Sequence, residues 1–208
     1  MQITKFIHSC LLLEEDGTSI LIDPGNYTAE AGVLNISTLD ALDYLLITHE
    51  HADHMDLSLI KEIIKKFPNI KIISNNSVAS LLDKEGIKAL TESDQMIKME
   101  TVTHEKVFGS TPPENVMMTI AEKLVHPGDS HHFKTKAPIL ALPVQAPWGS
   151  LTEAVELAES LKPEVILPIH DWHWNDKARD MLYKRLEDYF AKIGIRFIPL
   201  RTGEMVEI

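Results

Sequence analysis

The sequence contains a single cysteine, Cys10, among its 208 residues. A disulfide within the chain is therefore impossible, although a fold of this length can bury about 70% of its unfolded surface without one. No apolar run approaches the roughly 18 to 20 residues that a membrane-spanning helix requires. The opening segment does not resemble a secretory signal, because His8, Ser9 and the acidic residues 14–16 break it up. We therefore expect a cytoplasmic protein with no membrane partner.

Basic residues are also few, with 20 Lys and Arg against 31 Asp and Glu, so the formal net charge is −11. Nucleic acids and anionic lipids bind surfaces on which Lys and Arg cluster. We therefore expect no nucleic-acid partner. A small anionic substrate is still compatible with this charge, because a bound metal ion can reverse the field inside one pocket. The sequence leaves the oligomeric state open.

No linker, repeat or shift of composition divides the chain, and we expect one domain over residues 1–208. Apolar runs predict strands within 3–13 and at 19–22, 44–47, 70–74, 95–108, 115–126, 139–143 and 165–169. Helical spacing predicts helices at 59–67, 77–84, 152–161 and 178–193. Strands in both halves, each half with a helix near its end, predict an α/β sandwich with two inner sheets and outer helices.

Two details of these helices can be checked. Ser58 and Asp56 are both candidate caps for the helix at 59–67. On the last helix, Met181, Tyr189 and Ile193 fall on the apolar stripe and are expected to face the core.

The segment H-E-H-A-D-H follows the buried strand predicted at 44–47. His49 and His51 are two residues apart, so an extended backbone would aim both side chains the same way. Asp53 and His54 follow where the chain can curve round the same point. A tetrahedral zinc ion takes three or four such ligands. Because the four candidates are adjacent in sequence and point in different directions, they suit two neighbouring ions, each of which needs further ligands from other parts of the chain.

Three later residues could supply those ligands. His104, Asp129 and His170 each lie where a predicted strand gives way to a loop. Loops positioned by a rigid sheet carry a large share of binding and catalytic residues. The spacing alone does not decide which ion each residue would hold.

This pattern resembles the metallo-β-lactamase superfamily: H-x-H-x-D-H at 49–54, then His104, Gly-Asp-Ser at 128–130, and His170. The likeness covers nearly the whole chain and implies a four-layer αββα sandwich. The opening F-I-H-S-C at 6–10 and I-L-I-D-P at 20–24 look like a subgroup of small cytoplasmic hydrolases related to the ascorbate-6-phosphate lactonase. Ile7 stands where those relatives usually carry glycine.

The resemblance implies a centre of two divalent metal ions. The implied ligands are His49, His51 and His104 for the first ion, Asp53, His54 and His170 for the second, and Asp129 as the bridge. Asp23 matches a carboxylate that supports the metal loop. Imidazole-rich ligands without a thiolate favour Zn²⁺, and Mn²⁺, Fe²⁺ and Ni²⁺ also suit this set.

The implied function is a metal-dependent hydrolase of the lactonase, esterase or phosphodiesterase type. A hydroxide bridging the two ions would cleave an ester, lactone or phosphoester bond in a small molecule, with Asp53 orienting it or relaying its proton. Two alternatives stay open. One is a phosphodiesterase or nuclease of the same fold that acts on nucleotides or RNA, and the other is a non-catalytic binding protein that retains the fold.

Several further side chains could contact a substrate. They are His8, His126, His131, Trp148 and His173. Four of them also have a structural interpretation: a buried histidine for His8, a brace of the following turn for His126, a surface loop for His131 and its neighbour His132, and core packing for Trp148.

Overall fold

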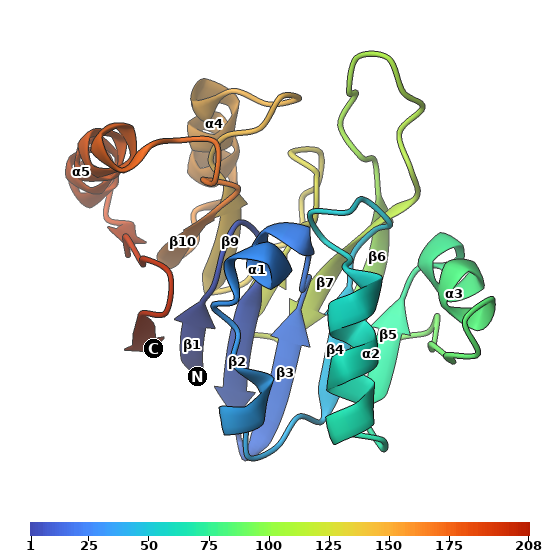
Figure 1. Ribbon diagram of the computed structural model, residues 1–208. Helices are drawn as coiled ribbons and strands as arrows, with labels where there is room; N and C mark the ends of the chain where they lie inside the picture. The colour runs from blue at the N-terminus through green and yellow to red at the C-terminus, as the bar shows by residue number, and fades with distance from the viewer.

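A computed structural model describes residues 1–208 and contains two six-stranded sheets that lie between helices (Figure 1). The first sheet consists of β1 (Gln2–Lys5), β2 (Leu11–Glu15), β3 (Thr18–Ile22), β4 (Tyr44–Ile47), β5 (Lys71–Ser74) and β12 (Met205–Glu207). The second consists of β6 (Ile97–Val102), β7 (Asn115–Ile120), β8 (Leu124–His126), β9 (Ile139–Pro143), β10 (Val165–Ile169) and β11 (Arg196–Phe197). The helices are α1 (Asn26–Ala31), α2 (Leu57–Lys66), α3 (Asn76–Asp83), α4 (Leu151–Leu161) and α5 (Asp176–Lys192), with a short 3₁₀ turn, η1 (Ile36–Thr38).

Strand order in each sheet combines antiparallel and parallel pairs. The first sheet runs β12-β1-β2-β3-β4-β5, with β3, β4 and β5 parallel to one another. The second runs β11-β10-β9-β8-β7-β6, with β8, β9, β10 and β11 parallel. Parallel strands end at the same edge of a sheet, where α/β folds commonly place their ligands.

Side-chain alternation explains why both sheets are buried on both faces. Leu11 and Leu13 of β2 enter the core between the sheets, whereas Leu12 joins the core beneath α2 and α3. Ala141 of β9 likewise faces the inner core, whereas Leu140 packs towards α4 and α5. This period of two produces three apolar layers and confirms the four-layer αββα sandwich that the sequence predicts.

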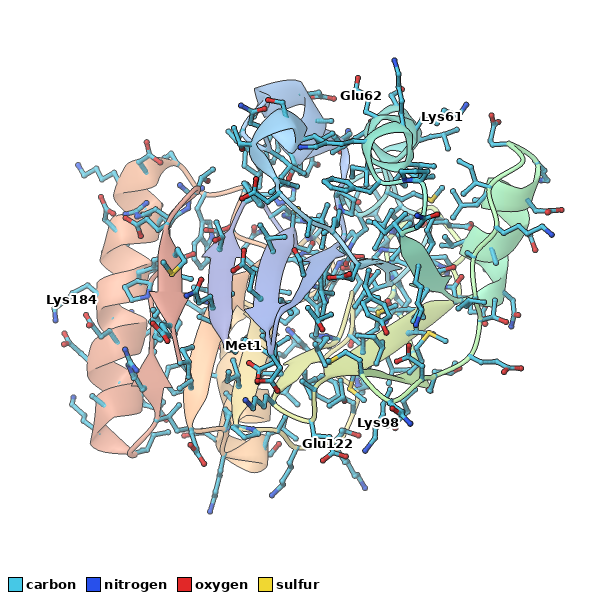
Figure 2. All side chains as sticks on the ribbon, turned by 90° about the horizontal axis from the view of Figure 1, so that it is seen from below. Met1, Lys61, Glu62, Lys98, Glu122 and Lys184 are labelled. Atoms are coloured by element: carbon cyan, nitrogen blue, oxygen red, sulfur yellow. The ribbon has the colours of Figure 1, made fainter.

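Charged residues cover the outside of this sandwich (Figure 2). Lys61 and Glu62 project from the outer face of α2, and Lys184 projects from α5. None of the helices combines the length and the hydropathy of a segment that crosses a membrane.

The structure confirms one of the two candidate caps of α2 and corrects the expected buried face of α5. Asp56 caps α2, since its side chain accepts the backbone N–H of Leu59 at 2.8 Å, so Ser58 is not the cap. On α5, Met181, Tyr189 and Ile193 are 65%, 38% and 46% exposed. The expectation that these three residues face the core is wrong. The buried face of α5 is narrower, because it rests on the sheet through Tyr183, Leu186 and Phe190.

The strand predicted over 115–126 is two strands. β7 and β8 pair antiparallel, and Ala121 and Glu122 reverse the chain between them with φ of 50° and 57°. Neither residue is a glycine or an asparagine, so the composition gives no turn signal at this point.

A buried ion network ties β1 to the loop after β10. Lys5 Nζ lies 2.8 Å from Asp171 Oδ2 and 3.1 Å from the Tyr183 hydroxyl, and Arg179 Nε lies 3.0 Å from the same carboxylate oxygen. Burial lowers the pKa of Lys5. Buried charges persist only when paired in this way. Because Asp171 follows His170 directly, the network fixes the backbone on which that histidine stands.

Candidate metal centre

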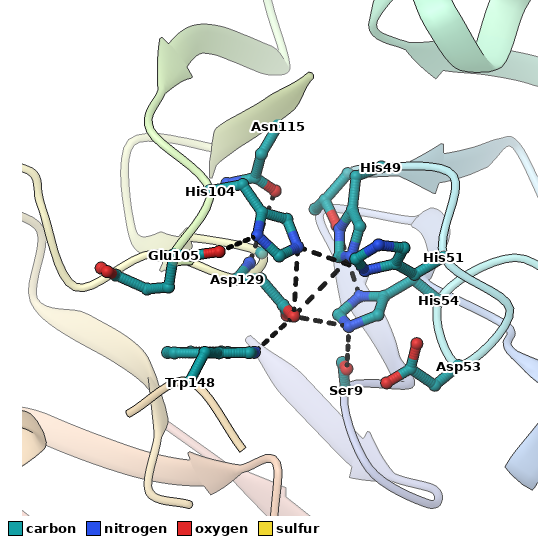
Figure 3. A network of polar contacts seen from close by, with 12 residues as sticks. Ser9, His49, His51, Asp53, His54, His104, Glu105, Asn115, Asp129 and Trp148 are labelled. Carbon is teal, nitrogen blue, oxygen red and sulfur yellow. Dashed lines mark hydrogen bonds and ion pairs between the residues drawn. The ribbon is translucent and has the colours of Figure 1, made fainter. Parts of the chain in front are cut away.

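The H-x-H-x-D-H segment begins directly after β4 and curves over the carboxyl end of the first sheet. His49 is fully buried and His51 half-buried. His49 Nε2 and His104 Nε2 each lie 3.2 Å from His51 Nδ1. Together with Asp129 these residues form one group, whose ligand atoms all lie within 4.8 Å of one another (Figure 3).

A second group lies on the other side of Asp129. It consists of His8, His54 and His170, each with a ring nitrogen within 4.8 Å of the others. All three side chains are buried. The Ser9 hydroxyl lies 3.3 Å from His54 Nε2 and 3.2 Å from His170 Nε2.

Asp129 connects the two groups. Its Oδ1 lies 2.9 Å from His54 Nε2 and 2.8 Å from His170 Nε2, and its Oδ2 lies 3.8 Å from His49 Nε2 and 3.5 Å from His104 Nε2. Burial opposes ionisation of this carboxyl, yet the surrounding imidazoles hold its pKa well below the ordinary value. The side chain is therefore an anion shared between two clusters of nitrogen atoms.

Gly128 allows Asp129 to take this position. Its φ is 58°, and a Cβ at this residue would lie 2.2 Å from the Asn115 side-chain oxygen. The same oxygen accepts the backbone N–H of Asp129 at 3.4 Å. The Gly-Asp pair in the sequence thus reflects a left-handed turn that only glycine fills without a clash.

Buried acceptors outside the clusters fix the imidazole rings. Asp23 Oδ2 lies 2.7 Å from His54 Nδ1, and the same carboxylate accepts the backbone N–H and the hydroxyl of Thr48, both at 2.8 Å. His104 Nδ1 lies 2.6 Å from the Glu105 carbonyl oxygen. Each contact places a proton on Nδ1 and turns Nε2 inwards, as in histidines that bind metal.

Replacing Asp23 with asparagine is expected to weaken metal binding by roughly 10- to 100-fold, because His54 loses the carboxylate that orients it. Chelator competition on the purified variant would measure the affinity. The matched control is Asp56→Asn, which alters the cap of α2 and should leave the affinity unchanged. Equal affinities for the Asp23 variant and the unmodified protein would contradict this role.

The donor atoms fit a divalent metal ion. In the first group the contacts of 3.2–3.8 Å approach the ~3.3 Å edges of a tetrahedron with bonds of about 2.0–2.1 Å. Burial lowers the pKa of His49 and brings that of His170 to about 3, so both rings are neutral. Against the effect of burial, Asp129 and Asp23 raise the pKa of His54, and a bound cation would take the place of its Nε2 proton. Asp129 Oδ1 is buried without a hydrogen-bond donor. The two groups therefore offer donor atoms that suit a divalent cation.

The structure places Asp53 outside both groups. Its Oδ2 lies 3.1 Å from His8 Nε2, and the side chain is 26% exposed. Burial opposes its ionisation, but the hydrogen bond from His8 and the charge on His54 lower the pKa of Asp53. Asp53 therefore presents an ionised carboxylate at the mouth of the site.

Trp148 and His173 each lie beside a histidine of the second group. The Trp148 indole N–H donates to Asp129 Oδ2 at 2.7 Å, and its ring packs edge-on against His170 and His131, at centroid distances of 5.4 and 5.2 Å. His173 is exposed, and its ring lies 6.0 Å from that of His8.

His126 and His131 have internal partners instead. Buried His126 places Nε2 3.0 Å from the Ser9 carbonyl and accepts the Gly128 N–H at 3.3 Å, so it braces two loops. His131 Nε2 lies 2.9 Å from the Pro143 carbonyl. His132 is exposed, and its Nδ1 forms a hydrogen bond with the Glu105 carboxylate.

The sequence does not predict that Ser9 and Tyr27 lie near the centre, nor that Tyr27 contacts Trp172. Ser9 could have been found as the neighbour of His8. Tyr27 on α1 and Trp172 after β10 stack face to face, 4.0 Å apart with an interplanar angle of 3°. Tyr27 also meets His8 edge-on at 5.3 Å. Their pairing joins segments 145 positions apart (172 − 27), and no local pattern marks it.

Comparison with known proteins identifies the family. A family model described as a β-lactamase superfamily domain matches residues 2–170, from β1 to His170. Protein Rv0786c of Mycobacterium tuberculosis is 30% identical over 201 residues, which cover 90% of this chain and 92% of that protein. The chain therefore belongs to the β-lactamase superfamily, in its metallo-β-lactamase fold.

Other relatives share the whole length. A UPF0173 metal-dependent hydrolase of Carboxydothermus hydrogenoformans is 24% identical over 233 residues and covers 99% of both chains. Among solved structures, the metallo hydrolase Igni18 of Ignicoccus hospitalis has a TM-score of 0.72 at 19% identity, with 99% of this chain and 97% of that one covered. These comparisons do not test the narrower likeness to the ascorbate-6-phosphate lactonase, which stays a prediction.

Proposed function

We propose that this protein, a metal-dependent hydrolase of the metallo-β-lactamase superfamily, cleaves an ester, lactone or phosphoester bond in a small molecule at a centre of two divalent metal ions. The observation that carries the proposal is the shared position of Asp129. One oxygen of this buried carboxylate faces His54 and His170, and the other faces His49 and His104. A carboxylate between two imidazole clusters suits a pair of cations.

Zinc is the ion we propose for both positions, since neutral imidazole and carboxylate donors favour it. When bound, such a pair lowers the pKa of a shared water and polarises the oxygen of the bond to be cleaved. The protein contributes fixed ligands, because Asp23 and the Glu105 carbonyl hold the rings of His54 and His104 in one tautomer.

Asp53 is the proposed proton acceptor. Its carboxylate is ionised and half-buried at the mouth of the site, where the attacking water would enter. The contact with His8 Nε2 holds it in one orientation. A proton acceptor must be deprotonated at the working pH, which the lowered pKa of Asp53 ensures, and we propose that the water binds within its reach.

Aromatic walls support a small substrate. Trp148 covers Asp129 on one side, and the stacked pair of Tyr27 and Trp172 lies beyond His8 on the other. Aromatic side chains of this kind commonly line sites for small molecules, whereas a polynucleotide needs a basic surface that a chain of net charge −11 does not favour.

The test is metal content and a substrate panel. We expect about two equivalents of zinc in the reconstituted protein, and turnover of a lactone, ester, thioester or phosphodiester in preference to long RNA. Lys61→Ala, on the exposed outer face of α2, is the control and should keep full activity. Cleavage of RNA as fast as the best small substrate would favour the nuclease. Full metal content with no turnover of the panel would favour a binding protein.

A further inference from the structure

We propose that His8 is a ligand of the second metal ion, together with His54, His170 and Asp129, and that Asp53 supports His8 through a hydrogen bond instead of binding that ion. The inference rests on the two-metal centre proposed above. It changes the ligand set that the sequence motif implies, in which Asp53 holds this ion.

Backbone conformation places His8 at the second group. His8 lies between β1 and β2 with φ of 65°, and His170 follows β10 with φ of 61°. Both are left-handed conformations that a side chain with a Cβ rarely adopts, and strain of this kind concentrates at functional sites. The His170 N–H donates to the His8 carbonyl at 3.2 Å, and the two rings lie 3.9 Å apart. The fold thus holds two imidazoles together at a conformational cost.

The nitrogen atoms of His8 suit a ligand. One is within 4.8 Å of the ring nitrogens of His54 and His170 that complete the group. Nε2 contacts Asp53 Oδ2 at 3.1 Å, whereas Nδ1 is buried without a hydrogen-bond partner. A carboxylate at one ring nitrogen fixes the tautomer and leaves the other lone pair for a metal, an arrangement that recurs at histidine–metal sites.

With His8 included, each of the two proposed ions has the same kinds of ligand. The first group offers three imidazoles, from His49, His51 and His104, and one oxygen of Asp129. With His8, the second group also offers three imidazoles. The other oxygen of Asp129, Oδ1, lies 2.9 Å from His54 Nε2 and 2.8 Å from His170 Nε2. Three nitrogens and one oxygen make a complete tetrahedral set. Asp53 is then free to act as the proton acceptor.

The experiment is a titration of the metal-free protein with Co²⁺, followed by visible absorption and by chelator competition. Three variants are compared with the unmodified protein: His8→Ala, Asp53→Ala, and the control His173→Ala, which removes an exposed imidazole near His8. We expect two equivalents in the unmodified protein and in the control. His8→Ala should keep the first equivalent and weaken the second by ~100-fold or more, whereas Asp53→Ala should weaken it by ~10-fold.

The comparison of His8→Ala with Asp53→Ala decides which residue binds the second ion, because the true ligand should lose more affinity for the second equivalent. A loss for Asp53→Ala that equals or exceeds the loss for His8→Ala would overturn it, as would unchanged binding in the His8 variant. One equivalent in the unmodified protein would overturn the two-metal centre itself. Circular dichroism checks folding, and His8→Gln, which keeps a polar side chain without an imidazole, must show the same loss if the alanine variant does not fold.

Discussion

Replacing Asp129 with alanine is expected to abolish hydrolysis and to remove both metal ions. The two carboxylate oxygens of Asp129 face the two imidazole groups, so its loss takes an anionic ligand from each of the two proposed ions. We expect kcat/KM on the best substrate to fall by about three orders of magnitude or more, which is ~4 kcal/mol of transition-state stabilisation. Elemental analysis and initial rates on the same preparation would measure both effects.

Asp188→Ala is the control for this variant. Asp188 is an exposed carboxylate on α5 that pairs with Lys184, and surface substitutions of this kind change stability by only about 0.5 kcal/mol. Its metal content and rate should equal those of the unmodified protein. Retention of two equivalents by Asp129→Ala, or of full activity without metal, would contradict the central role of Asp129.

Replacing Gly25 with alanine is expected to destabilise the fold and displace the metal loop. Gly25 has φ of −85°, which alanine accepts, so the effect is steric. A Cβ would lie 1.8 Å from the Asp53 carbonyl oxygen and 2.6 Å from the His54 nitrogen. Both atoms are backbone and cannot rotate away. We expect a loss of about 3 kcal/mol or more in the free energy of unfolding, measured by urea denaturation.

Gly32→Ala is the control that separates the steric clash at residue 25 from the loss of stability caused by replacing any glycine. Gly32 lies at the other end of α1 with φ of 61°, and a Cβ at this residue would meet no neighbouring atom within 4 Å. Only backbone strain of about 1–2 kcal/mol is therefore expected. Metal affinity should fall in Gly25→Ala alone. Equal stability losses in the two variants would show that the contact with the metal loop is unimportant.

The sequence predicts local features well, because short-range geometry determines them. The buried strand at 44–47 and the motif at 49–54 are contiguous, so the direction of His49 and His51 follows from the strand itself. Strand runs in both halves of the chain, each half with a helix near its end, likewise predict two inner sheets between outer helices. The turn at Ala121 and Glu122 has no such signal in the sequence. The exposure of Met181 depends on how much of the surface of α5 packs against the sheet.

The sequence by itself determined the four-layer architecture and a set of histidines and carboxylates suited to metal. The tertiary structure decided how that set divides. Asp129 lies between the two groups because the loop after β4 of the first sheet meets the loops after β8 and β10 of the second at this carboxylate. His8 enters the second group because the loop after β1 bonds the loop after β10, across 162 positions (170 − 8) of chain. Contacts between such distant segments depend on sheet packing, which no local spacing encodes.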